Sequence, residues 1–131
     1  MYLIHAGLNT VAVVLLTVGV YFAIKKPQNW FPKHRALMLS GAVVLTISVF
    51  YALWLKEYNM SAKKESSLHS HIGAVLFILL FIQVFIAVTH RKELGPKYLF
   101  IHKTGAMLIF GLLIFQVYLG IKEYTSRKNN I

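Results

Sequence analysis

The sequence predicts an all-α membrane protein with four transmembrane helices in an antiparallel up-down-up-down bundle. Of its 131 residues, 57% are hydrophobic and only 14% are charged, whereas a soluble domain has about 45–50% apolar and about 25% charged residues. The hydrophobic residues also fall in four long runs separated by short basic segments. Because one span needs about 20 apolar residues, we expect a single transmembrane domain over residues 1–131 and no stand-alone enzyme.

The four predicted spans cover about residues 2–24, 34–55, 68–89 and 98–121. At about 1.5 Å per helical residue, each is long enough to cross a hydrocarbon layer about 30 Å thick. The runs lack the alternation of barrel strands and are too long for them. The connections between them are short, so neighbouring helices are expected to run in opposite directions.

The net charge of +10 belongs to these connections. Lysines and arginines lie between and after the apolar runs, as they do beside membrane spans, and we therefore expect no nucleic-acid binding. The first and third connections hold eight basic residues and one acid, and the second connection and the tail hold six and three. The positive-inside rule then favours both termini on the non-cytoplasmic side.

Each predicted span begins at or near a histidine: His5, His34, His69 and His102. Because the helices alternate in direction, His5 and His69 are expected near one membrane face, and His34 and His102 near the other. A histidine inside a membrane bundle is costly unless it is paired, hydrogen-bonded or bound to a metal. Two facing imidazoles can supply both axial ligands of a b-type haem without cysteine, which the chain lacks. The pattern predicts two haem b groups.

The third span contains a second histidine, His71, which remains open as the alternative ligand to His69. The two residues lie about 200° apart around a helix, so only one of them faces the bundle interior. A zinc site on His69 and His71 would need Glu65 as a third ligand and is a weak alternative. His90, at the end of the span, is interpreted as a solvated interfacial group.

Glycines accompany three of the four histidines. Gly73 follows His69 by four residues, Gly105 follows His102 by three and Gly41 follows His34 by seven. These spacings place each glycine on the face of its histidine, where a flat macrocycle would need a surface without side chains. Helix–helix packing is the alternative role of such glycines in membranes. No nucleotide-binding or hydrolase motif occurs, and no catalytic residue is predicted.

Several of these residues resemble the cytochrome b561 family. Leu68–Gly73, with Gln83 farther along, is similar to that family's Leu-His-Ser-Trp-Leu-Gly helix, and Tyr2–His5 and Lys33-His34 are similar to its first two core helices. Ile101-His102, with Gly105 and the closing Leu119–Glu123, resembles its last core helix.

The resemblance implies four core helices that hold two b haems and carry electrons across the membrane, with His5 paired to His69 and His34 paired to His102. The family commonly has six helices, and it has a tryptophan where this chain has His71. Its ascorbate-contacting basic pattern is not clearly matched, so the electron donor and acceptor stay open.

The first two spans also resemble a small four-helix family associated with haem–copper oxidase assembly, through Gly7–Asn9 and His34–Met38. This second resemblance implies an alternative function as a haem-free membrane assembly or scaffold subunit of a respiratory complex. For the haem-bearing interpretation, the expected partners besides the lipid bilayer are a redox partner protein, a quinone or a small reductant. The chain is also expected to act as a homodimer or within a larger membrane complex.

Overall fold

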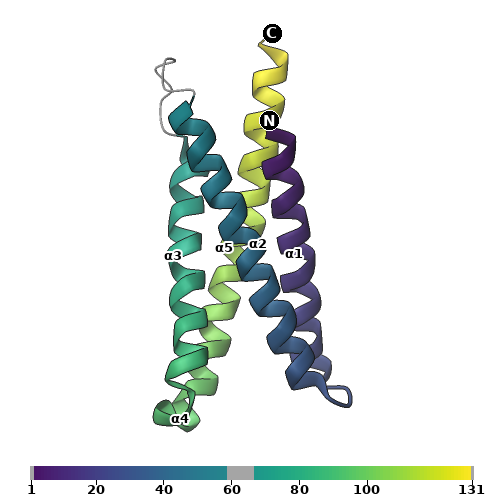
Figure 1. The fold of residues 1–131 in the computed structure, drawn as a ribbon, viewed down its shortest axis with the longest axis vertical. Helices are drawn as coiled ribbons and strands as arrows, with labels where there is room; N and C mark the ends of the chain where they lie inside the picture. Colours follow the sequence, from purple (N-terminus) through teal and green to yellow (C-terminus); the bar gives the residue numbers. More distant parts are fainter. Residues whose placement is uncertain (1, 59–66, 131) are drawn as a thin grey trace. The chain divides into compact units, whose positions relative to one another are not determined.

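A computed structural model describes residues 2–58 and 67–130, and it is almost entirely helical. The elements in chain order are α1 (Tyr2–Lys25), α2 (Trp30–Tyr58), α3 (Leu68–Thr89), α4 (Arg91–Leu94) and α5 (Pro96–Asn129) (Figure 1). Within the described ranges there is no strand. Four of these helices, α1, α2, α3 and α5, are long and apolar enough to cross a membrane. The prediction of an all-α protein with four membrane spans is confirmed.

The chain divides into two compact units, Met1–Lys64 and Glu65–Ile131. The first unit is a hairpin of α1 and α2, and the second is a hairpin of α3 and α5 joined by the short α4. In each hairpin, residues near the start of one helix contact residues late in the other. The assembly of the two hairpins into one four-helix bundle stays a prediction.

Two helices extend beyond the predicted spans. The first connection is shorter than expected because α2 begins at Trp30, and the turn before it is closed by Lys26 and Asn29 with positive φ angles of 46° and 57°. The predicted fourth span ends at about residue 121, whereas α5 continues through polar residues to Asn129. Arg127 pairs with Glu123 one turn earlier, and basic residues in the last turn favour the helix dipole.

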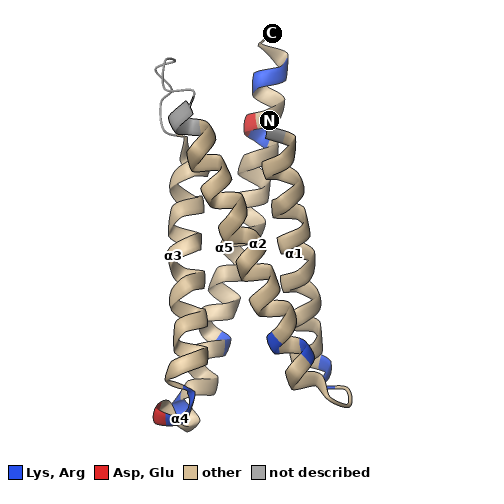
Figure 2. Ribbon diagram, in the orientation of Figure 1, with Lys and Arg blue, Asp and Glu red and all other residues tan. Residues whose placement is uncertain are grey.

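The charged residues lie towards the ends of the described helices, with long uncharged stretches between them (Figure 2). The basic residues of the first connection flank the turn between α1 and α2, and those of the third lie in α4 and in the first turns of α5. The second connection, which carries Lys63, Lys64 and Glu65, lies mostly outside the described residues. The observed placement agrees with the interpretation of the charge as flanking membrane spans.

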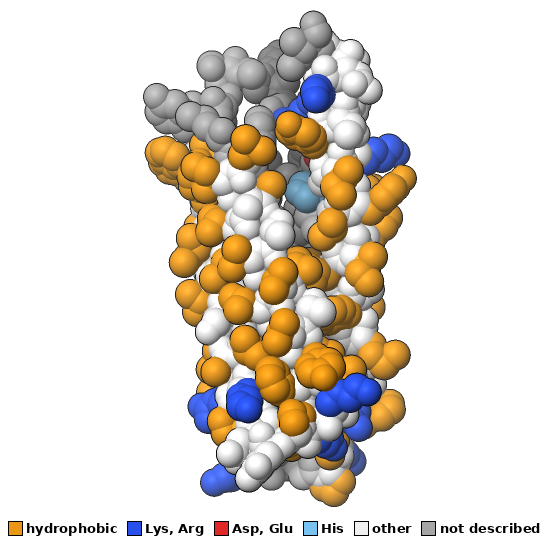
Figure 3. Space-filling view, turned by 90° about the vertical axis from the view of Figure 1, so that its right-hand side faces the viewer, with side chains coloured by type: hydrophobic (Ala, Val, Ile, Leu, Met, Phe, Trp, Pro, Cys, Tyr) orange, Lys and Arg blue, Asp and Glu red, His pale blue; other side chains and the backbone are white. Residues whose placement is uncertain are grey.

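Each hairpin has a narrow apolar core and a wide apolar surface. The core is formed by Ala12, Leu16, Leu45 and Leu55 in the first unit and by Leu76, Leu80, Ile109 and Leu113 in the second. Large hydrophobic side chains are exposed along the helices on the face drawn in Figure 3, and Phe100 is 75% exposed and Met107 is 76% exposed. Helices that are apolar on all sides are typical of lipid surroundings, and the protein is an integral membrane protein.

Candidate functional site

The first histidine, His5, lies in the first turn of α1 within a closed set of hydrogen bonds to α2. Its Nδ1 is 3.1 Å from the Ser48 carbonyl oxygen and 2.9 Å from Ser48 Oγ. Ser48 Oγ donates to Asn9 Oδ1 at 2.8 Å, and Asn9 Nδ2 donates to His5 Nε2 at 3.1 Å. Ser48 is fully buried. These partners place the ring proton on Nδ1 and the lone pair on Nε2.

The second histidine, His34, lies in the second turn of α2. Its Nδ1–H donates to the Gly19 carbonyl oxygen of α1 at 2.7 Å. The two helices approach closely here, because a Cβ on Gly19 would lie 2.8 Å from Met38 Sδ. The Trp30 ring, one turn earlier, lies 6.1 Å from the imidazole between centroids. His34 is therefore also held against the backbone of the facing helix.

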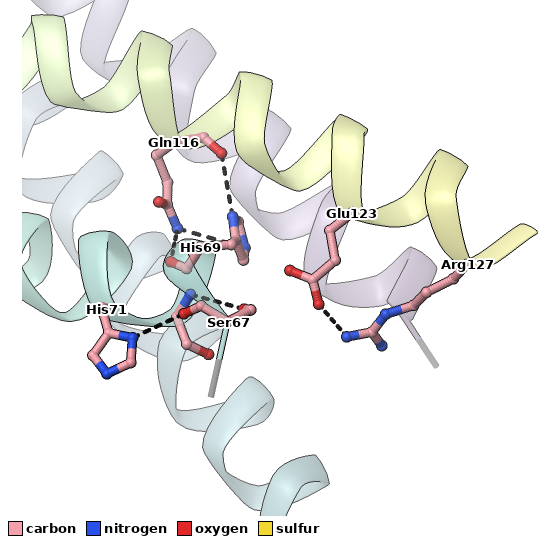
Figure 4. Close-up of polar contacts among 7 residues, drawn as sticks. Ser67, His69, His71, Gln116, Glu123 and Arg127 are labelled. Carbon is pink, nitrogen blue, oxygen red and sulfur yellow. Dashed lines mark hydrogen bonds and ion pairs between the residues drawn. The ribbon is translucent and has the colours of Figure 1, made fainter. Parts of the chain in front are cut away.

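The third histidine, His69, forms hydrogen bonds with one residue of α5, Gln116 (Figure 4). Its Nδ1–H donates to the Gln116 carbonyl oxygen at 3.3 Å, while the Gln116 side-chain amide donates to the His69 carbonyl oxygen at 2.8 Å. The same amide nitrogen is 3.5 Å from His69 Nε2. Gly120 leaves room for the ring, since a Cβ there would lie 3.1 Å from His69 Cε1. Gln116 thus fixes both the backbone and the ring of His69.

The fourth histidine, His102, is bound by a glutamine of α3. Gln83 Nε2 donates to the His102 carbonyl oxygen at 2.7 Å and lies 3.0 Å from His102 Nδ1. Tyr98, one turn earlier on α5, stacks on the imidazole with centroids 5.3 Å apart, and its hydroxyl is 3.4 Å from Nδ1. Unlike the other three rings, His102 directs Nδ1 at a side-chain amide.

One spacing relates the contacts of the first hairpin. His5 meets Ser48, which follows His34 by 14 residues (34 to 48). His34 meets Gly19, which follows His5 by 14 residues (5 to 19). Fourteen residues are about four helical turns, so each helix presents its histidine and its contact residue on the same face.

The second hairpin has the same spacing. His69 meets Gln116, which follows His102 by 14 residues (102 to 116). His102 meets Gln83, which follows His69 by 14 residues (69 to 83). In both hairpins, therefore, one histidine lies near each end, and the two are about 21 Å apart along the helix axis at 1.5 Å per residue.

The structure supports an interior position for His69 rather than His71. His69 is half-buried against Gln116, whereas His71 is exposed and its Nδ1–H donates to the Ser67 carbonyl oxygen at 3.0 Å. Figure 4 shows the His71 ring pointing away from Gln116. His90 caps the end of α3 beside Thr89 and Glu93, which agrees with its predicted surface position. Over residues 2–58 and 67–130, no cluster of three metal-ligating side chains is present, and Glu65 lies outside those ranges.

The three predicted glycines lie at contacts inside the hairpins. A Cβ on Gly41 would lie 2.8 Å from Leu16 Cδ2, one on Gly73 2.7 Å from Gln116 Nε2, and one on Gly105 2.5 Å from Gln83 Oε1. Gly73 and Gly105 therefore make room for the two glutamines that reach the histidine backbones. Their contact with a haem stays a prediction.

Replacing Gly73 by alanine is expected to destabilise the α3–α5 hairpin by about 1–3 kcal/mol, the usual cost of overpacking. The added Cβ would displace the Gln116 amide, which is 2.7 Å from that position. Gly111→Ala is the matched control, because a Cβ there meets nothing within 4 Å. Thermal unfolding in detergent should show a lower Tm for the first variant and an unchanged or higher Tm for the second. Equal Tm values would contradict the packing role.

The sequence alone did not identify Gln116, Ser48, Asn9 or Gly19 as partners of the histidines. A signal for three of them was present, since each lies 14 residues after a histidine that begins a span. Asn9 lies one helical turn after His5. Polar side chains such as Ser48 and Gln116 are uncommon inside membrane spans and usually have a specific partner there.

The fold and these sites define an integral membrane protein whose long helices hold histidines in their interior contacts. The family model of eukaryotic cytochrome b561 matches residues 28–127, which is more than half of the chain. The chain belongs to the cytochrome b561 family and is a membrane electron-transfer protein of the b-type haem class. The matched range contains His34, His69 and His102, and His5 precedes it. No curated protein and no solved structure matches the chain.

Proposed function

We propose that the protein holds two haem b groups and relays single electrons between the two faces of the membrane. The proposed axial pairs are His5 with His69 and His34 with His102, and Gly41, Gly73 and Gly105 are the proposed haem-facing glycines. The observation that supports this most is the 14-residue register common to both hairpins. Because of this register, each hairpin has one histidine near each of its two ends. Each hairpin could therefore supply one axial ligand to each of two haems.

The donor set is compatible with haem iron. The ring protons of His5, His34 and His69 are directed from Nδ1 at backbone carbonyl oxygens, which places the lone pair on Nε2 and makes the ring more basic. At His5 a metal would take the place of the Asn9 amide, which donates to Nε2 at 3.1 Å. When bound, haem b supplies a one-electron Fe(III)/Fe(II) couple. The role of the chain is to orient the four rings and to exclude water with its apolar helices.

The proposed partners are the lipid bilayer and a redox protein, a quinone or a small reductant. The chain itself is proposed to act as a homodimer or within a larger membrane complex. Lys33, Arg35 and Lys103 lie within one turn of His34 or His102, and their charges would attract an anionic reductant to that end. We further propose that both termini lie on the non-cytoplasmic side, on the basis of the charge of the connections.

The relay is tested with the purified protein in liposomes that contain trapped ferricyanide, with ascorbate added outside. The wild-type protein should reduce the trapped ferricyanide, and His34→Ala/His102→Ala should reduce it at the rate of empty liposomes. His71→Ala is the matched control and should keep the wild-type rate. A wild-type rate in the double variant would overturn the relay through that pair.

A haem-free assembly or scaffold subunit is the second candidate. The hydrogen bonds around His5 support it, because Asn9 Nδ2 already satisfies His5 Nε2 at 3.1 Å without a metal. Under this alternative, the protein purified from a haem-sufficient host contains no haem, and its absorption spectrum shows no band that changes on reduction.

A further inference from the structure

The two ends of the α3–α5 hairpin present opposite hydrogen-bonding groups to their histidines. At one end His69 Nδ1 faces the carbonyl oxygen of Gln116 at 3.3 Å, which only accepts hydrogen bonds. At the other end His102 Nδ1 faces the side-chain nitrogen of Gln83 at 3.0 Å. An amide nitrogen donates hydrogen bonds and does not accept them. His102 Nδ1 is therefore an acceptor in this arrangement.

The orientation of the Gln83 amide is fixed by its other contact. Gln83 Nε2 also donates to the His102 carbonyl oxygen at 2.7 Å. Exchanging the amide oxygen and nitrogen would place two oxygens at that distance and remove the bond. The amide has two N–H groups, so one can bind the carbonyl oxygen and the other the ring nitrogen. The glutamine thus imposes a donor on His102 Nδ1.

We propose that Gln83 is a positioning residue that sets the tautomer of His102 opposite to that of His69. A neutral imidazole carries one proton, which lies on Nδ1 in His69 and on Nε2 in His102. The significance of this difference rests on the proposed function, in which both rings are haem ligands. The hydrogen bonds that set the two tautomers are formed between residues of this chain and do not involve a haem.

The two ends therefore differ in their readiness to bind a metal through Nε2. His69 already has its lone pair on that atom. In His102 the single ring proton must first move from Nε2 to Nδ1 before Nε2 can bind a metal, and the net charge of the ring does not change. There the Tyr98 hydroxyl, 3.4 Å away, can accept a hydrogen bond, whereas the Gln83 nitrogen cannot. Gln83 therefore opposes the transfer of the His102 proton to Nδ1. Replacing Gln83 would allow His102 to adopt the same tautomer as His69.

The test uses the full-length, haem-free chain in detergent with ¹⁵N-labelled histidine, because ring nitrogen resonances distinguish protonated from unprotonated nitrogen. His69→Ala and His102→Ala assign the two rings. The expected result is a proton on Nδ1 of His69 and on Nε2 of His102. The same tautomer in both rings would overturn the proposal without the need for any further variant.

Gln83→Met then tests the cause, since methionine has a similar length and no amide. The resonances of His102 should move towards protonated Nδ1 while those of His69 stay in place. Gln28→Met is the matched control in the exposed turn before α2 and should change neither ring. A His102 tautomer unmoved by Gln83→Met would show that another group sets it and would overturn the role of Gln83.

The result is separable from the proposed function. Haem content of the wild-type protein, measured on a haem-loaded preparation, tests that function without reference to the tautomers. Two tautomers in a protein that binds no haem would leave this inference standing and refute the dihaem relay. Two haems in a protein whose haem-free form has the same tautomer in both rings would support the dihaem relay and refute this inference.

Discussion

Replacing His69 by alanine is expected to remove about half of the bound haem, whereas replacing His71 leaves haem content unchanged. The two residues are neighbours on the first turn of α3, but only His69 contacts the facing helix, through Gln116. His71 is exposed and donates to its own helix start at Ser67. Bis-histidine ligation requires both rings, so loss of one ligand should empty one site.

The measurement is pyridine haemochrome quantitation per chain on the two purified variants. His71→Ala is the matched control, because it changes the same residue type two positions away on the same helix. Haem loss in His71→Ala with retention in His69→Ala would contradict the assignment of the third-helix ligand. Circular dichroism on both variants checks that helix content is unchanged.

Pairs of histidine replacements are expected to divide into two classes. His5→Ala/His69→Ala removes both ligands of one proposed site and should leave about one haem per chain. His5→Ala/His34→Ala removes one ligand from each proposed site and should leave no stable haem. The same number of imidazoles is lost in both cases, so each double variant serves as the control for the other.

The haem content of these double variants tests the pairing across the two hairpins. Equal haem in the two would contradict the proposed pairs. The opposite order, with His5→Ala/His34→Ala retaining one haem, would mean that both ligands of a site come from a single hairpin. The 14-residue register argues against this last arrangement, because it separates the two histidines of one hairpin by about four helical turns.

Much of the fold could be predicted from the sequence because a membrane span has a strict length and composition. The third span, Leu68–Thr89, was predicted at its observed boundaries. The end of α5 was missed, since Ser126–Asn129 are polar and hydropathy alone cannot indicate a helix that continues beyond the apolar run. The Glu123–Arg127 pair, one turn apart, was the local signal for its continuation.

The positions of the histidines were predictable, but most of their partners were not. A backbone carbonyl such as that of Gly19 or Gln116 has no signature in the residue type. The glutamines were visible as polar residues in apolar runs, yet their targets depend on the register of two helices. That register is set by side-chain packing at positions such as Gly73 and Gly105. The 14-residue spacing is present in the sequence, but no local pattern identifies it as the register of two facing helices.

The most direct test of the central claim is the haem content of the wild-type protein. A reduced-minus-oxidised spectrum combined with pyridine haemochrome quantitation on purified protein should give b-type bands and about two haems per chain. The expectation follows from the two histidines at opposite ends of each hairpin, each held by the residue 14 positions after the histidine of the facing helix. One haem per chain would contradict the two-site account, and a protein without haem would favour the assembly or scaffold role.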